Sequence, residues 1–235
     1  MEENAERYSG GMAQNSPVID HFRTEISLGR LVPGQRLPPE PRLCEQLDVS
    51  RGALREALRE LQGYGLIEVR HGSGTYVSSL QPSELLKGLA FTVDVVPLDG
   101  LFELLSIRRT LEAEAAAQTA TAASGEVLAQ LEALVEEMVG AESPPEEQKL
   151  DEQFHALICE TAGNRSAATI TAVIRSRSRH YDLVDNPEAR AEGVIGHRAV
   201  LDAVRTHDSM GAWAAMHAHI TSTERWLRSL KPPPH

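Results

Sequence analysis

The stretch of residues 49 to 61, which reads VSRGALREALREL, constrains the fold more than any other part of the chain. Arginines recur at every fourth position on one side of a helix, at Arg51, Arg55 and Arg59. Leucines line the other side, at Leu54, Leu58 and Leu61. The Ser50 hydroxyl can accept a backbone N–H of the first turn, so the helix is expected to begin there. The pattern predicts a helix with one face on a core and one face free to enter a groove of DNA; the alternative is an exposed helix with solvated arginines.

The segments on either side predict a small module around this helix. Upstream, residues 18 to 31 and 42 to 47 have the pattern of two helices, separated by the turn VPGQRLP. Downstream, residues 66 to 70 alternate apolar and polar side chains, and the turn HGSG leads into a second strand at residues 75 to 77. Three short helices followed by a hairpin form a winged helix-turn-helix.

Residues 18 to 78 resemble the winged helix-turn-helix of the GntR family of bacterial transcription regulators. The resemblance rests on the stretches GRLVPGQRLPPE, VSRGALREALRELQGYGLI and HGSGTYV, and it covers the whole module. It implies that Ser50, Arg51 and Arg55 contact phosphates and base edges, and that His71 and Gly72 place the tip of the wing in the minor groove. These roles suit the chemistry, because an arginine can bind the edge of guanine in the major groove and a glycine turn brings backbone amides close to phosphate.

The chain departs from the family pattern at three positions. Pro39 stands where the family has a serine that caps the second helix, and this loss is expected to cost about 1 kcal/mol. Pro41 stands where the family has an arginine that contacts DNA, so Arg42 either takes over this contact or the contact is missing. Gly52 lies in the first turn of the DNA-facing helix, where it weakens the helix and offers no side chain to a base.

Composition limits the class of protein. The chain has 235 residues with 41% hydrophobic but 4% aromatic content, which suits a helical protein with two domains. No run approaches the roughly 20 apolar residues of a membrane span, and no signal peptide is recognisable, so we expect a cytoplasmic protein without membrane contact. The cysteines, Cys44 and Cys159, are expected to be buried free thiols rather than metal or redox groups.

The net charge of −11 is distributed unevenly. Residues 18 to 78 carry eight arginines against eight acidic residues, whereas residues 81 to 235 carry 14 basic against 23 acidic residues. The acidity thus belongs to the second part of the chain. In the first part, the placement of the arginines must supply the positive surface, and binding to DNA should weaken steeply with salt.

The predicted organisation has four parts. Residues 1 to 16 form a disordered tail, 17 to 78 the winged module, 79 to 97 a short linker, and 98 to 231 an all-α antiparallel bundle with a ligand-binding and dimerisation role. Within the linker, Ser83 is expected to cap a small helix that runs to about Ala90. Six helices are predicted in the bundle: Asp99 to Ala123, Gly125 to Val139, Glu146 to Thr161, Asn164 to Leu183, Pro187 to Thr206 and Ser209 to Leu230.

Histidines carry the candidate chemistry of the bundle. Asp151 and His155 lie four residues apart on one predicted helix, so both side chains point the same way and can bind one ion. His197 and His219 belong to two later helices, and a histidine on an apolar face is by itself more often a hydrogen-bonded core residue than a metal ligand. The set resembles the metal-binding pattern of the FCD domain, the effector domain of the FadR subfamily of GntR regulators. Histidines with one carboxylate suit Zn²⁺ or Ni²⁺ and leave positions for water or an effector oxygen.

Other polar residues of the bundle are candidates for the effector. Arg108 resembles the arginine of the family's Arg-xx-Leu-Glu motif, which implies that it binds an effector carboxylate in bidentate fashion; Glu112 can instead neutralise it as a helix pair. Asn164 looks first like a helix cap, although the resemblance allows a role in the pocket. His217 is expected to face solvent, because the apolar neighbours of His219 place that residue inward. Three arginines alternate along one predicted helix, so at most one or two of them can face inward, and a solvated face is the favoured interpretation: Arg175, Arg177 and Arg179.

These features predict a homodimeric regulator, repressor or activator, that binds a pseudo-palindromic double-stranded DNA operator and responds to a small carboxylic acid. In one alternative, the metal is purely structural or is itself the signal. In another, the four ligands form a metal-dependent hydrolase; however, no independent base or nucleophile accompanies them, and an enzyme is not expected.

Overall fold

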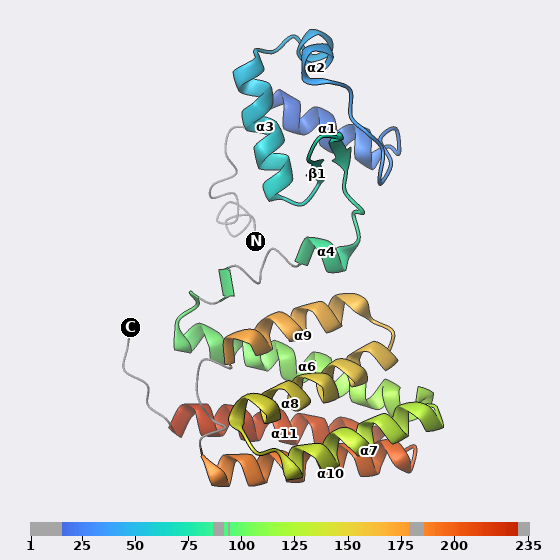
Figure 1. The fold of residues 1–235 in the computed structure, drawn as a ribbon, viewed down its shortest axis with the longest axis vertical. Coiled ribbons are helices and arrows are strands. Elements are labelled where there is room, and N and C mark those ends of the chain that lie inside the picture. Colours follow the sequence, from blue (N-terminus) through green and yellow to red (C-terminus); the bar gives the residue numbers. More distant parts are fainter. Residues whose placement is uncertain (1–15, 87–91, 94, 179–185, 230–235) are drawn as a thin grey trace, which may run out of the picture. The chain divides into compact units, whose positions relative to one another are not determined.

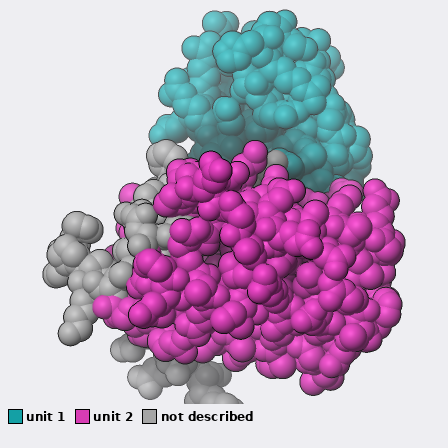
Figure 2. Space-filling view, turned by 60° about the horizontal axis from the view of Figure 1, so that its bottom comes forward, with its two compact units in different colours: residues 1–88 teal, residues 89–235 magenta. Residues whose placement is uncertain are grey.

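The computed structural model describes residues 16–86, 92–93, 95–178 and 186–229. The chain divides into two compact units, residues 1–88 and residues 89–235 (Figure 2). The tail predicted at residues 1 to 16 lies outside the described residues except for Ser16. None of the described helices is both long enough and apolar enough to cross a lipid bilayer.

The first unit is a winged helix-turn-helix, as predicted (Figure 1). Its core contains Phe22 from the first helix, Leu54 and Leu61 from the third, and Ile67 and Val77 from the two strands. The strands are antiparallel, and Ile67 pairs with Val77. The elements are α1 (Pro17–Ser27), α2 (Glu40–Leu47), α3 (Arg51–Gly63), β1 (Ile67–Arg70), β2 (Gly74–Val77) and α4 (Pro82–Leu86).

Helix α1 ends at Ser27, four residues before the predicted end at Leu31. Gly29 has a φ of 69°, which turns the backbone out of the helix, and the N–H groups of Arg30 and Leu31 both donate to the carbonyl of Glu25. A glycine of this kind commonly ends a helix. Residues 28 to 31, whose apolar spacing predicted a continued helix, therefore form a turn.

Helix α2 begins at Glu40, two residues before the predicted start, and its N-cap Pro39 makes no side-chain cap hydrogen bond. The expected loss of the cap is therefore confirmed. In contrast, Ser50 caps α3 as predicted, because its hydroxyl accepts the N–H of Ala53 at 3.1 Å.

The expectation that Ser83 caps a small helix is wrong, because α4 begins at Pro82 and includes Ser83. Proline suits the first position of a helix, where no backbone donor is needed. The carbonyl of Gln81 accepts the N–H groups of Glu84 and Leu85, so Gln81 precedes the first turn. The predicted extension of this helix to Ala90 lies outside the described residues.

The second unit is a bundle of helices, as predicted, in which α11 packs along both α6 and α10 (Figure 1). Its main core contains Leu131, Phe154, Ile158, Met216 and Ile220. The main helices of this unit are α6 (Leu98–Ala122), α7 (Gly125–Gly140), α8 (Pro144–Thr161), α9 (Arg165–Ser178), α10 (Pro187–Arg205) and α11 (Ser209–Ser229). Most of their ends agree with the predictions within one or two residues; the predicted continuation of α9 through residues 179 to 183 and the final residue 230 lie outside the described part.

The two cysteines differ in burial. Cys159 is buried in the core of the second unit, as predicted, whereas Cys44 is only partly buried at the edge of the first core. The prediction for Cys44 is therefore wrong in part. Both are free thiols.

Leu54 offers a test of the core of the first unit, because its side chain is fully buried. We expect Leu54→Ala to lower the free energy of unfolding of this unit by about 2–5 kcal/mol, since the change removes buried methyl groups and leaves a cavity. Arg59→Ala, on the exposed face of the same helix, should change it by less than about 0.5 kcal/mol.

Urea unfolding followed by circular dichroism and by tryptophan fluorescence separates the units, because Trp213 and Trp226 both belong to the second one. The Leu54→Ala variant should show an earlier transition by circular dichroism than by fluorescence. An unchanged circular dichroism transition would contradict the assigned core.

Candidate metal centre and nucleic-acid interface

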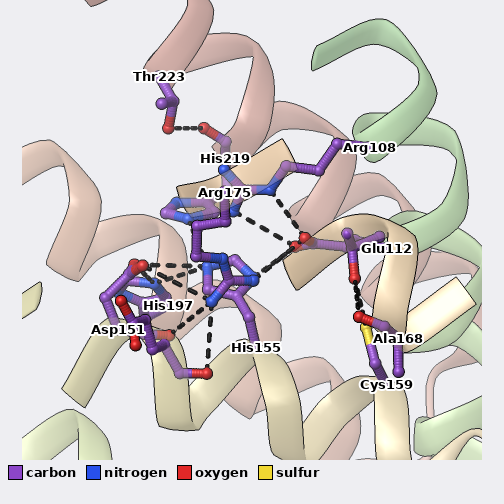
Figure 3. Close-up of polar contacts among 12 residues, drawn as sticks. Arg108, Glu112, Asp151, His155, Cys159, Ala168, Arg175, His197, His219 and Thr223 are labelled. Atoms are coloured by element: carbon purple, nitrogen blue, oxygen red, sulfur yellow. Dashed lines mark hydrogen bonds and ion pairs between the residues drawn. The ribbon is translucent and has the colours of Figure 1, made fainter. Parts of the chain in front are cut away.

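Four side chains converge inside the second unit (Figure 3). Asp151 and His155 come from α8, His197 from α10 and His219 from α11. One ligand atom from each of them lies within 4.8 Å of the other three. The three histidines are buried, as expected for side chains that face the core. The structure thus brings together the four residues that the sequence pattern selected.

The distances in this cluster fit a bound ion. The Nε2 atom of His155 lies 3.3 Å from Nε2 of both His197 and His219. Asp151 Oδ1 lies 3.1 Å from His197 Nε2 and 3.4 Å from His155 Nε2. Around Zn²⁺ with bonds of about 2.0–2.1 Å, tetrahedral ligand atoms lie roughly 3.3 Å apart. Three imidazole nitrogens facing one another and a carboxylate oxygen therefore have the spacing and chemistry of a metal-ligand set.

Local sequence explains how these side chains meet. Asp151 and His155 occupy neighbouring turns of α8, which places them on one face. Gly196 precedes His197 on α10, and a Cβ atom at that glycine would lie 2.3 Å from Nδ1 of His219. The missing side chain of Gly196 is therefore what allows the His219 ring to lie against α10.

Burial and charge favour the metal-binding form of three of these groups, Asp151, His197 and His219. Burial lowers the pKa of His219 well below its usual range, and the neighbouring His197 and His155 lower it further. Burial also lowers the pKa of His197. Burial would raise the pKa of Asp151, but His155, His197 and Arg175 outweigh it and hold that pKa well below its usual range. Neutral imidazoles and an ionised carboxylate are the forms that bind metal ions.

A fully buried carboxylate, Glu112 on α6, lies directly behind His155 (Figure 3). Its Oε2 atom is 2.5 Å from His155 Nδ1, on the side of the ring opposite the cluster. Its Oε1 atom accepts hydrogen bonds from Arg108 Nε at 2.7 Å and from an Arg175 Nη2 N–H at 3.1 Å. Burial would raise the pKa of Glu112, but the guanidinium charges of Arg108 and Arg175 and the contact with His155 together hold it well below its usual range.

The interpretation of Arg175 as part of a solvated face is wrong. Its side chain is buried, and besides Glu112 it donates to the backbone carbonyls of Asp151 at 3.1 Å and Glu152 at 3.4 Å. Arg177 is partly buried and donates to the carbonyl of Val96, while Arg179 lies outside the described residues. Alternate arginines on a helix do not reveal which of them faces inward, and the partner of Arg175 is 63 residues away.

The two residues predicted to bind an effector occupy different places. Arg108 is buried and pairs with Glu112, as the alternative interpretation of a helix pair expects. Asn164 is exposed and caps α9, since its Oδ1 accepts the N–H of Ala167 at 3.0 Å. It precedes Arg175 by 11 residues, or roughly 16 Å along the helix, so the structure does not bring it to the cluster. His217 is only partly exposed, because its ring stacks on Trp213.

The first unit presents the predicted arginines of α3 to solvent. Arg51 and Arg55 are exposed, and Arg55 Nε donates to Glu40 Oε2 at 2.8 Å. Arg42 on α2 is also exposed. A Cβ atom at Gly52 would meet only the Ser50 hydroxyl, at 3.9 Å, so this surface has open space where a base-reading side chain could lie.

The wing ends in a short exposed turn. His71 and Gly72 are exposed between β1 and β2, and Gly72 has a φ of 72°, a conformation that favours glycine. The turn is closed by the N–H of Ser73, which donates to the carbonyl of Arg70 at 2.9 Å. The guanidinium of Arg70 lies 4.2 Å above the centre of the Tyr76 ring and is paired with the Glu68 carboxylate.

The lowered pKa values of His197 and His219 predict how the metal-free protein responds to pH. The unfolded chain takes up protons on these histidines near their usual pKa of about 6.5, whereas the folded protein takes them up only at a lower pH. Their stabilising contribution is therefore complete above about pH 6.5 and is lost as the pH falls below it. Asp151 and Glu112 have lowered pKa values, so their contribution is lost only below about pH 4.

Urea unfolding of chelator-treated protein between about pH 7 and pH 5 measures this effect. The free energy of unfolding should fall more steeply with acid in the wild type than in the double variant His197→Gln/His219→Gln. The control His217→Gln should keep the wild-type slope. Equal slopes in the wild type and the double variant would contradict the assignment.

Both parts of the chain match known protein families. Residues 14–77 match the bacterial regulatory proteins of the gntR family, and residues 103–222 match the FCD domain. The Uxu operon transcriptional regulator of Escherichia coli (strain K12) is 32% identical over 83% of this chain and 79% of its own length. A putative L-lactate dehydrogenase operon regulatory protein of the same strain is 31% identical over 87% of this chain and 82% of its own length.

A solved structure has the same fold. It is named Streptococcus agalactiae GntR, and it superposes with a TM-score of 0.61 and 29% sequence identity over 88% of this chain and 97% of its own. The relatives are transcriptional regulators, not enzymes. The chain therefore belongs to the gntR family of bacterial transcription regulators and joins the DNA-binding domain of that family to an FCD domain.

Proposed function

We propose that this regulator binds a pseudo-palindromic operator as a homodimer and that a small carboxylic acid, bound at a divalent metal ion in the FCD domain, controls this binding. The observation that carries the proposal is the convergence of Asp151, His155, His197 and His219 around one point. The resemblance to a regulator named for an L-lactate dehydrogenase operon supports a carboxylate as the effector.

Three imidazoles and one carboxylate would hold Zn²⁺ or Ni²⁺ with positions left for a further oxygen ligand. When bound, the ion supplies a positive charge that attracts the oxygen atoms of a carboxylate. The charges already present balance one another, since Arg108 and Arg175 face Glu112 and Asp151. A divalent ion would leave this interior with excess positive charge, which favours an anionic ligand.

Arg108 is the proposed partner of the effector carboxylate. Its Nε and one Nη group face Glu112, and a guanidinium carries five N–H donors in all. An effector would therefore share this guanidinium with Glu112. The planar donor arrangement of arginine suits a carboxylate that approaches from a second side.

A dimer would place two α3 helices in successive major grooves of the operator. Effector binding can change DNA affinity only if the effector binds more tightly to one arrangement of the two DNA-binding domains than to the other. The alternatives within the same family are a structural metal ion and a metal ion that is itself the signal.

Arg51 tests the nucleic-acid interface. In fluorescence anisotropy titrations with duplex DNA, Arg51→Ala should weaken binding by about 1–3 kcal/mol and make the affinity less dependent on salt, because one cationic contact is removed. Arg23→Ala, which removes an exposed arginine from α1 of the same unit, is the matched control and should bind like the wild type. An equal loss in both variants would show that Arg51 acts only through net charge.

Thermal unfolding tests the proposed effector class. Metal-loaded and chelator-stripped protein would be compared with a panel of small carboxylic acids that includes L-lactate. A ligand that binds the native state raises the unfolding temperature by mass action. We expect an acid from this panel to raise the unfolding temperature much more when metal is present than in its absence, and we expect this metal-dependent increase to be lost in Arg108→Ala and His155→Ala.

The control His217→Ala should keep the acid-dependent shift, because His217 lies on α11 but outside the cluster. A metal-dependent shift that no acid increases would contradict the carboxylate proposal and favour a structural or sensed metal ion.

A further inference from the structure

The Glu112 carboxylate joins three helices of the FCD domain. It lies on α6, its relative exposure is 0%, and its partners are Arg108 on the same helix, His155 on α8 and Arg175 on α9. The metal-ligand set does not include it, and its position behind His155 keeps it away from the ligand atoms (Figure 3).

One oxygen atom of Glu112 determines which nitrogen of the His155 ring carries the proton and which one is free to bind a metal ion. A neutral imidazole has one N–H and one lone pair, and the N–H goes to the nitrogen that has an acceptor. Glu112 Oε2 lies 2.5 Å from His155 Nδ1, and this carboxylate oxygen favours the tautomer with the proton on that nitrogen. The lone pair is then on Nε2, the atom that faces Asp151, His197 and His219.

The other oxygen atom neutralises two arginines. Glu112 Oε1 lies 2.7 Å from Arg108 Nε and 3.1 Å from Arg175 Nη2. Both guanidinium groups are buried, so neither has bulk water as a substitute for this carboxylate. Any other anion that binds to these arginines must therefore compete with the Glu112 carboxylate.

We propose that Glu112 is a positioning residue that serves both halves of the effector site: it orients His155 toward the metal ion, and it is the internal counter-ion with which an effector carboxylate must compete for Arg108 and Arg175. This inference rests on the proposed function, because it assigns a residue to the same site. It makes Glu112 the physical link between metal binding and anion binding.

The two roles predict opposite effects for Glu112→Gln, which keeps the size of the side chain and removes its charge. Binding of Ni²⁺ should weaken by about 10- to 100-fold, the usual result of losing a carboxylate that orients a metal-binding histidine. Binding of L-lactate to metal-free protein should become several-fold tighter, because the arginines lose their internal counter-ion. General damage to the fold would weaken both.

The experiment uses the full-length protein. Ni²⁺ affinity is measured by competition with a chromogenic chelator, and L-lactate affinity is measured by calorimetry on chelator-stripped protein. Glu114→Gln is the matched control, because Glu114 is exposed on the same helix, and it should match the wild type in both measurements.

Glu112→Asp keeps the charge and shortens the side chain, which moves the carboxylate away from His155. It should weaken Ni²⁺ binding without tightening lactate binding, and it provides the test if Glu112→Gln does not fold.

The outcomes distinguish this inference from the proposed function. Wild-type protein that binds no Ni²⁺ would overturn the proposed function and the metal half of the inference together. If the wild type binds Ni²⁺ and Glu112→Gln binds it equally well, the metal site stands and the role in orienting His155 is overturned. If L-lactate binds metal-free Glu112→Gln no more tightly than metal-free wild type, the counter-ion role is overturned.

Discussion

The FCD domain depends on how it compensates the buried negative charge of Glu112. An ionised carboxylate in an apolar interior is costly unless charged partners and hydrogen bonds surround it. Glu112 has three such partners, and they come from α6, α8 and α9. Because His155 on α8 and Arg175 on α9 must both reach one carboxylate on α6, the interaction constrains how far α8 and α9 are shifted along α6. The position of His155, and through it the geometry of the candidate metal site, follows from this constraint.

Small residues allow the other helices to complete the site. Ala113, Ala116 and Ala120 on α6 are fully buried in the core, so the backbone of this helix can approach its neighbours closely. Gly196 does the same for α10, where any side chain would displace the His219 ring. Three imidazole rings from separate helices can therefore lie together, because small residues on α6 and α10 leave room for them. A site in the interior of a helical bundle is a common arrangement for metal and ligand binding.

The sequence predicts the fold well, because helical periodicity and the cap at Ser50 are local signals. Ser83 shows the limit of local signals, since a proline directly before it also starts a helix. The candidate metal ligands can be predicted from their spacing and from the family resemblance. The contacts of Glu112 with His155 and Arg175 cannot, because Arg108, four residues earlier on the same helix, already accounts for its charge in the sequence. Arg175 was assigned wrongly because its partner lies far away in sequence.

The most direct test of the metal-site account is anomalous diffraction from crystals grown with Zn²⁺ or Ni²⁺, recorded at the absorption edge of that metal. The account predicts one strong peak about 2.0–2.2 Å from Asp151 Oδ1 and from Nε2 of His155, His197 and His219. Density for an added L-lactate carboxylate should lie between this peak and Arg108. A metal peak elsewhere, or none in protein shown to contain one equivalent of metal, would contradict the assignment of the four residues as the metal site.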